Sequence, residues 1–310
     1  MKNTLKAYIG LILMILIVGF SFLFVKMGLA VTNSYDHLAH RFNAAFLFVL
    51  LLWGTGIIKI QKIEKKEWLK IIGVSIFYPV LCFGFQTVGL EYATTSQAGI
   101  IFALVPVITL LGGTIFLKEK TSVQQKIGIV LSVAGVIYLF AGNSQAETGN
   151  IKGTVLLLLS VTSMVVYYMI GKKMMERHDS LFLTGIMILV GFVIFNVLSV
   201  GRHLLYGTLP EYAAPLFHAR FLISVLYLGV LSSVLTSFFS NYALVHISTT
   251  QISVFNNLIP IITILAGILV LHETLSIRQI VGGAAVMLGV VLVVGIRSAK
   301  NKNANKKHTS

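Results

Sequence analysis

Two adjacent amides, Asn256 and Asn257, are the most informative polar groups in an otherwise apolar segment, residues 248–271. An amide in a hydrocarbon environment is costly unless it forms hydrogen bonds. These side chains must therefore bond either to neighbouring helices or to a bound solute. Ser253 lies three residues before Asn256 and so shares its helix face. We expect this face to bind a solute, with Gln97 and Gln251 as further candidates and interhelical bonding as the alternative.

Three prolines fall near the middle of apolar segments: Pro79, Pro106 and Pro260. A proline inside a helix removes one backbone hydrogen bond and clashes with the carbonyl group four residues earlier. Such breaks are tolerated in membranes where the freed groups face protein or a wet cavity, and in transporters they mark binding sites. A simple helix kink is the alternative.

Charged groups inside or beside the apolar segments are few, and Lys26, Arg41 and Glu91 are expected toward the outer surface. Long basic side chains can extend from such positions to the polar interface. A second hypothesis is an outer gate, in which Glu91 pairs with Lys26 or Arg41 in one conformational state.

The composition identifies the environment of these residues. The chain has 310 residues, of which 56% are hydrophobic and 11% are charged, whereas soluble domains carry about 25% charged residues. This composition and a mean hydropathy of +0.91 exclude a soluble enzyme, a disordered chain and a nucleic-acid-binding domain. The single cysteine, Cys82, permits neither an intramolecular disulfide framework nor a cysteine-based metal site.

Ten apolar segments are long enough to cross a bilayer, whose core of about 30 Å needs about 20 helical residues. They are continuously apolar rather than alternating, which favours helices over a membrane barrel. The expected fold is an all-α polytopic membrane protein with ten transmembrane helices. The segments are residues 7–31, 37–58, 68–89, 94–117, 122–141, 152–171, 181–202, 219–245, 248–271 and 277–295.

The basic residues predict the orientation of the chain. With both termini in the cytoplasm, most of the 24 lysines and arginines lie on the inner side, as the positive-inside rule requires. This distribution explains the net charge of +14 without a nucleic-acid partner. The basic tail, residues 297–310, would rest near anionic lipid. The residues expected outside are Lys26, Arg41, Lys152, Arg202, Arg220 and Arg278.

An internal repeat appears when the sequence is shifted by 154 residues. Residues 92–136 then align with 246–290 without a gap, and 15 of these 45 positions are identical, including Pro106/Pro260 and Glu119/Glu273. Five helices per repeat is an odd number, so the two repeats must be inverted relative to each other. The expected domains are the N-terminus 1–6, repeat one at 7–141, a linker at 142–151, repeat two at 152–296 and the tail 297–310.

The chain also resembles the EamA-type, ten-helix members of the drug/metabolite transporter superfamily. The resemblance rests on 89-Gly-Leu-Glu-Tyr-92, 94-Thr-Thr-Ser-Gln-Ala-98, 117-Leu-Lys-Glu-119, 271-Leu-His-Glu-273 and 40-His-Arg-Phe-42. The chain departs from the family pattern in two respects. It has 18-Val-Gly-Phe-20 where the family has a Trp-Gly pair, and Lys118 and His272 where the family has a glycine before each helix-end glutamate.

The resemblance implies a central cavity surrounded by helices one, three, four, six, eight and nine. It therefore adds candidate binding residues on helices three, six and eight, although tyrosines near helix ends also form interfacial belts. These candidates are Tyr78, Gln86, Tyr167, Tyr168 and Asn241.

The expected function is secondary transport of a small organic metabolite by alternating access across the cytoplasmic membrane. Export is the expected direction, as the resemblance implies, and the solute is expected to be neutral or zwitterionic, amino-acid-like or drug-like. A passive facilitator or uptake permease and a membrane sensor are the alternatives. The sequence distinguishes neither transport coupled to protons or to another ion from uncoupled transport, nor a monomer from a homodimer.

An enzyme is not expected, and neither a cofactor nor a metal is. The chain has no Gly-x-Ser-x-Gly motif, and no second histidine follows 272-His-Glu-273 at zinc-binding spacing. Its two aspartates, Asp36 and Asp179, are expected in loops on opposite sides of the membrane.

Overall fold

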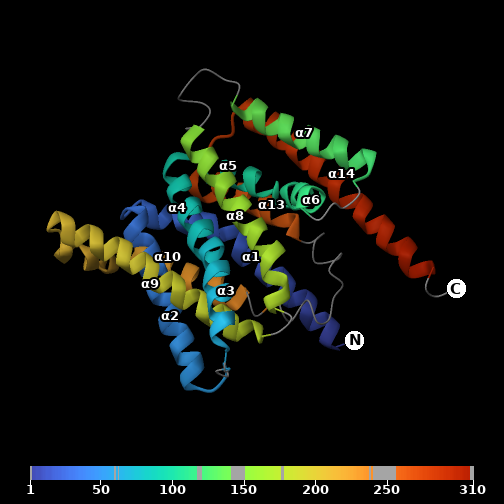
Figure 1. Ribbon diagram of the computed structural model, residues 1–310. Helices are drawn as coiled ribbons and strands as arrows, with labels where there is room; N and C mark the ends of the chain where they lie inside the picture. The colour runs from blue at the N-terminus through green and yellow to red at the C-terminus, as the bar shows by residue number, and fades with distance from the viewer. Residues whose placement is uncertain are drawn as a thin grey trace.

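The computed structural model describes residues 2–58, 61, 63–116, 121–140, 151–175, 178–236, 239 and 256–307. Helices are the regular secondary structure throughout these ranges (Figure 1). The all-helical class is thus confirmed for this part of the chain, and each of the ten expected segments contains helix. The first half forms α1 (Lys2–Leu29), α2 (Ser34–Gly54), α3 (Lys65–Ser75), η1 (Ile76–Leu81), α4 (Cys82–Tyr92), α5 (Thr95–Phe102), α6 (Val105–Phe116) and α7 (Val123–Phe140).

The second half is less regular than the first. A 3-10 helix, η2, precedes α10, and a π-helix, η3, continues from it. The elements are α8 (Ile151–Met175), α9 (Ser180–Tyr206), η2 (Leu209–Phe217), α10 (Ala219–Leu226), η3 (Tyr227–Leu235), α13 (Leu258–Leu271) and α14 (Ile277–Lys307).

Fewer helices than ten meet the length and hydropathy expected of a membrane span. Within the described residues five do so, and a sixth is added if the pair 209–217 and 219–235, bent by 89°, counts as one span. The apolar parts of α7, α13 and α14 are shorter, and α2 carries Asp36 and Arg41. The five helices are Leu5–Leu29, Lys65–Tyr92, Thr95–Ile115, Ile151–Ile170 and Leu181–Tyr206.

The third expected segment is interrupted at its proline. η1 follows α3 directly, and within it Tyr78 has non-helical angles of φ −142° and ψ 115°. Because a proline disfavours the helical region for the residue before it, Pro79 accounts for this conformation. The helix break expected at Pro79 is therefore present.

The other two prolines lie near the starts of helices. α5 ends at Phe102, and Pro106 is the second residue of α6, whereas Pro260 is the third residue of α13. A proline in the first turn of a helix costs no backbone bond, because the amides there have no partner within the helix. Both prolines therefore mark the start of a new helix rather than a bend within one.

Polar residues that recur in the two repeats form matching helix caps. At the start of α7, Gln125 Oε1 accepts from Ser122 N at 3.0 Å, and Gln125 N donates to Ser122 Oγ at 3.2 Å. Ser276 and Gln279 form the same pair of bonds at the start of α14, at 2.9 and 3.2 Å. This reciprocal arrangement is a capping box.

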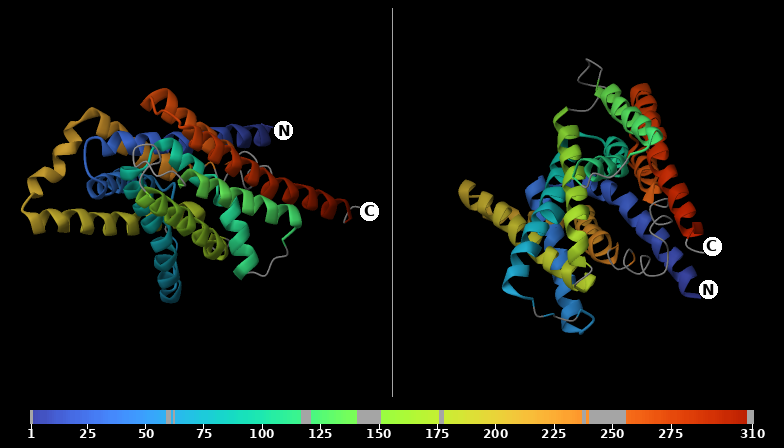
Figure 2. Two further views of the ribbon diagram at one scale, coloured as in Figure 1. Left: turned by 90° about the horizontal axis from the view of Figure 1, so that it is seen from above. Right: turned by 45° about the vertical axis from the view of Figure 1, so that its right-hand side comes forward.

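α7 and α14 run side by side (Figures 1 and 2), and their closest approach is at glycines of both helices. A Cβ atom at Gly128 would lie 2.6 Å from the carbonyl oxygen of Gly289, and one at Gly135 would lie 2.7 Å from that of Gly282. Gly128 aligns with Gly282 in the repeat, and Gly135 with Gly289. If the two repeats are exchanged, the Gly128–Gly289 contact becomes the Gly282–Gly135 contact. A two-fold relation between the repeats predicts this pattern.

Candidate functional site

Arg41 lies about 10 Å into α2 from its first residue, at 1.5 Å per residue, and only 1% of its surface is exposed. The sequence predicts a position toward the outer surface with the side chain extended to the polar interface, whereas the observed side chain is enclosed. The difference arises because α2 packs against α4, α9 and η3, which enclose the arginine within protein. A basic group buried in this way requires compensation from its neighbours.

Among the described residues, the neighbours of the Arg41 guanidinium are neutral. Its Nη2 donates to Ser233 Oγ at 3.5 Å, the upper limit for a hydrogen bond, and its buried Nε has no hydrogen-bond partner. Its Cζ lies 3.9 Å from the ring centroid of Phe83. Within the described residues, the ion pairs are His178–Glu67 and His203–Asp36, and neither involves Arg41.

Aromatic rings extend from this arginine in a connected series. Phe83 packs against Tyr78, with centroids 5.1 Å apart, and Tyr78 stacks on Tyr167 at 4.8 Å and 22°. η1, α4 and α8 supply these rings, so the irregular backbone at Tyr78 directs its side chain toward a helix of the second half. The resulting cluster of Arg41, Tyr78, Phe83, Tyr167 and Ser233 is called the Arg41 cluster below.

The close approach of η3 to α2 sets the position of Ser233 in this cluster. A Cβ atom at Gly229 would lie 2.7 Å from the carbonyl oxygen of Arg41 and 2.8 Å from the amide nitrogen of Ala45. Glycine is therefore required where η3 crosses α2. This crossing brings the Ser233 hydroxyl within reach of the arginine.

The other predicted binding residues are dispersed. Gln86 is buried in α4, whereas Tyr168 is 48% exposed on α8. Asn256 is exposed, and Asn257 directly precedes α13 without using its side chain as a cap. The expected sites at Asn241, Gln251 and Ser253 lie outside the described residues.

Gln97 has a local structural role. Its Oε1 accepts from Thr94 N at 3.0 Å, and its own amide nitrogen donates to Thr94 Oγ1 at 3.1 Å. The two residues form the capping box that starts α5. The pattern Thr-x-x-Gln before an apolar run could have indicated this role from the sequence.

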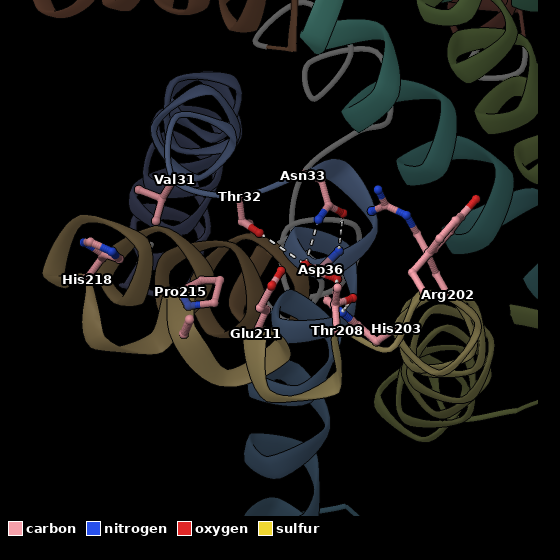
Figure 3. Close-up of a pocket in the computed structure, with 12 residues that line it drawn as sticks. Val31, Thr32, Asn33, Asp36, Arg202, His203, Thr208, Glu211, Pro215 and His218 are labelled. Atoms are coloured by element: carbon pink, nitrogen blue, oxygen red, sulfur yellow. Dashed lines mark hydrogen bonds and ion pairs between the residues drawn. The ribbon is translucent and has the colours of Figure 1, made fainter.

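A polar hub that the sequence reasoning did not predict surrounds Asp36 (Figure 3). Asp36 lies in the first turn of α2, 3% exposed, and not in a loop. Its Oδ1 accepts from Ser199 Oγ at 2.6 Å and lies 3.1 Å from His203 Nε2. Its Oδ2 accepts from Asn33 Nδ2 at 2.7 Å. The carboxylate thus joins α2 to α9.

A pocket of about 540 Å³ opens beside this hub, between the α1–α2 link, the end of α9 and η2. Arg202 and His218 line it together with Asp36 and Glu211, so both signs of charge are present (Figure 3). We call this side of the molecule the Asp36 end.

Glu273 connects α13 to α5 at the Asp36 end. Its Oε1 accepts from Thr95 N at 2.7 Å, and its Oε2 accepts from Ser96 N at 2.9 Å and from Ser96 Oγ at 2.7 Å. These amides begin α5, where unpaired N–H groups and the helix dipole favour an anion. A Cβ atom at Gly267 would lie 2.5 Å from Glu273 Oε2, so glycine leaves room for the carboxylate. We call this contact the Glu273 clasp.

The residues of the predicted gate make other contacts in this structure. Glu91 Oε1 accepts from Ser34 N at 3.1 Å, at the start of α2. Lys26 interacts electrostatically with both Glu273 and Glu91, but neither forms an ion pair with it within the described residues. Arg41 belongs to its own cluster. Glu91 and Glu273 thus both cap other helices, with Lys26 near each of them.

His272 reverses the chain so that Glu273 can reach α5. It has φ 54° and ψ 34°, a left-handed conformation, and its amide and that of Glu273 both donate to Gly267 O. A non-glycine residue pays about 1 kcal/mol or more for this conformation. This cost accounts for the glycine that the resemblance described above implies at this position.

We therefore expect His272→Gly to stabilise the protein by about 1 kcal/mol. This gain should raise the unfolding temperature of detergent-purified protein by about 1–3 °C. His218→Gly is the matched control, because His218 has φ −93° and glycine there gains no strain relief. Equal effects of the two changes on the unfolding temperature would contradict the strain at His272.

Comparison with known proteins identifies the family. The pattern of the EamA-like transporter family matches the chain twice, at residues 5–141 and 151–295. The chain belongs to the EamA-like transporter family. As an EamA-like protein it is a multi-pass membrane transporter and not an enzyme, in agreement with the sequence, and it works in a lipid bilayer on a small-molecule substrate.

Relatives of this EamA-like transporter extend over nearly its whole length. It is 40% identical over 286 residues to the uncharacterized transporter YcxC of Bacillus subtilis, covering 92% of this chain and 91% of that protein. An uncharacterized transporter of Archaeoglobus fulgidus is 27% identical, with 94% and 99% coverage. The WAT1-related protein At4g08290 of Arabidopsis thaliana is 25% identical, with 84% and 75% coverage.

A solved crystal structure shares the fold of this EamA-like chain. The TM-score is 0.58 at 15% sequence identity, and the match covers 93% of this chain and 96% of the other. At this level of identity the likeness concerns the fold alone.

Proposed function

We propose that the protein is a secondary transporter that exports a small organic metabolite across the cytoplasmic membrane by alternating access. In this proposal ten helices cross the membrane in two inverted repeats, residues 7–141 and 152–296. Both termini are cytoplasmic, and the Asp36 end faces outward. The solute is neutral or zwitterionic, amino-acid-like or drug-like.

The Glu273 clasp is the observation that carries the proposal. Thr95 and Ser96 belong to the first repeat and Glu273 to the second, so the clasp joins the two repeats at one end of the molecule. Alternating access requires contacts of this kind, which close one face and can open while the opposite face closes. Glu91 and Lys26 contribute to the same outer closure.

The crosswise glycine contacts of α7 and α14 support the inverted repeat. Ser132 Oγ also donates to Val286 O at 3.3 Å, and these two positions align in the repeat. A contact between equivalent residues is expected on a two-fold axis. Asn256 and Asn257 remain proposed binding residues, because Asn256 is exposed and the side chain of Asn257, the N-cap residue of α13, makes no capping bond.

Metabolite analysis of the culture medium tests export. We expect one compound class to accumulate several-fold above the empty-vector control when the protein is overproduced. Asn256→Leu at equal membrane abundance should reduce this accumulation, whereas Gln124→Leu, which removes an exposed amide of α7, should not. Unchanged medium would contradict export.

Vesicle uptake distinguishes the coupled exporter from a passive facilitator. Inside-out membrane vesicles with an imposed ion gradient should accumulate the exported compound above its external concentration. Equilibration without accumulation would instead favour the facilitator.

A further inference from the structure

We propose that Arg41 binds a carboxylate of the transported solute, which makes the substrate class a zwitterion with a free carboxylate. This inference rests on the proposed transport function and specifies its substrate. Three independent features of the Arg41 cluster lead to it: an uncompensated charge, unused donors and an adjoining aromatic surface.

The first feature is the charge. Arg41 stays protonated in proteins, and a buried cation is costly unless an anion accompanies it. The titratable groups that influence it most are Tyr78 and Cys82, both neutral at physiological pH. Two nearby acidic residues are bonded elsewhere: Glu91 accepts from Ser34 N, and Asp36 accepts from Ser199 Oγ. A bound anion would supply the missing charge.

The second feature is the set of unused donors. A guanidinium has five N–H groups arranged in a planar fork. Within the described residues one of them is used, in the 3.5 Å bond to Ser233, and Nε is buried without a partner. A carboxylate can accept two parallel bonds from such a fork. The Ser233 hydroxyl would provide an additional polar contact beside it.

The third feature is the aromatic surface. Phe83 covers one face of the guanidinium, and the stacked pair of Tyr78 and Tyr167 continues from Phe83. Rings next to a cation stabilise it and also offer an apolar surface to the body of a ligand. The arrangement therefore fits a carboxylate attached to an apolar or aromatic group rather than an inorganic anion.

The position of the cluster agrees with a transported ligand. Arg41, Tyr78 and Phe83 come from the first repeat, whereas Tyr167 and Ser233 come from the second. Substrate sites of inverted-repeat transporters lie between the repeats and beside interrupted helices. η1 and η3 are two such irregular segments, and both contribute to the cluster.

Co-purification tests this proposal directly. Detergent-purified wild-type protein, Arg41→Gln, Arg41→Lys and Arg220→Gln are incubated with a whole-cell metabolite extract and washed, and retained compounds are identified by mass spectrometry. We expect wild-type protein to retain carboxylates at least about tenfold above Arg41→Gln. Arg41→Lys should fall between them, because lysine keeps the charge but not the fork. Arg220, exposed on α10, is the matched control and should behave as wild type.

Thermal unfolding separates a binding role from a structural role. Arg41→Gln removes an uncompensated buried charge, so we expect its unfolding temperature in ligand-free detergent to rise by about 3 °C or more. A structural arginine would lower it. If Arg41→Gln does not fold, the comparison between wild type and Arg41→Lys decides the binding result.

Several results would overturn the proposal: retention of no compound by wild-type protein, retention of compounds without a carboxylate, or equal retention by the Arg41 variants. A failure of the proposed transport function would be seen in the metabolite analysis, as a culture medium that overproduction of the protein does not change. Carboxylates retained by purified protein but absent from the medium would keep the binding site and reject export. Exported compounds without a carboxylate would support export and reject the carboxylate site at Arg41.

Discussion

Gly289→Val is expected to abolish the accumulation of folded protein. A Cβ atom at this position would press against Ser132 Oγ and lie 2.5 Å from the carbonyl oxygen of Gly128. Backbone atoms of α7 cannot move aside as a flexible side chain could, so α14 would have to separate from α7. Overpacking in a well-packed region typically lowers the free energy of unfolding by about 1–3 kcal/mol. Because the contact here is with backbone, we expect a loss of about 3 kcal/mol or more. Marginally stable proteins seldom tolerate such a loss.

Size-exclusion chromatography of detergent-extracted membranes measures this effect. The monodisperse peak should fall at least about tenfold for Gly289→Val relative to wild type, since 1.4 kcal/mol changes a population tenfold. Gly201→Ala is the matched control, because nothing lies within 4 Å of a Cβ atom there. Alanine in that helix should leave the peak unchanged or increase it. A normal peak for Gly289→Val would show that α7 and α14 do not pack through these glycines.

Local sequence signals were sufficient for much of the fold. Continuous apolar segments predicted helices, and each of these segments contains one. The identical Ser122/Ser276 and Gln125/Gln279 pairs form capping boxes, a pattern readable over four residues. The same pattern at Thr94 and Gln97 also forms a capping box, which occupies the side chain predicted above to bind a solute. A capping box forms from neighbours in the chain and requires no ligand.

The candidate site depended on contacts that no local pattern contains. Asp36 and His203 are 167 residues apart, and Glu273 and Ser96 are 177 apart. Arg41 carried a signal, a charge in an apolar segment, but its burial follows from the helices that pack around α2. Hydropathy alone predicts a side chain that extends to the membrane interface, and with it a solute without net charge.

Glu273→Gln is expected to open the Asp36 end of the protein. The carboxylate accepts three hydrogen bonds from Thr95 and Ser96, each at 2.9 Å or less. Hydrogen bonds to a charged group contribute about 1.5–3 kcal/mol, and glutamine replaces one carboxylate oxygen with a donor that cannot accept from these amides. The loss of one such bond should increase the population of the outward-open state about tenfold or more.

The single cysteine provides the measurement without further engineering. Cys82 is 1% exposed and lies within electrostatic range of Arg41, so its modification reports access to the centre of the molecule. A membrane-impermeant thiol reagent, added outside intact cells, should label Cys82 at least about tenfold faster in Glu273→Gln than in wild type. Glu64→Gln, at an exposed cap whose side chain makes no capping bond, should label at the wild-type rate.

The direction of labelling decides what the clasp does. Faster labelling from outside together with slower labelling in inside-out vesicles is the result that alternating access requires, because opening one face depopulates the other. Export should then decrease, since the substrate would reach Arg41 from the cytoplasm in a smaller fraction of molecules. Faster labelling from both sides would mean that Glu273 stabilises the fold in general. An unchanged rate from outside would show that the clasp does not close the Asp36 end.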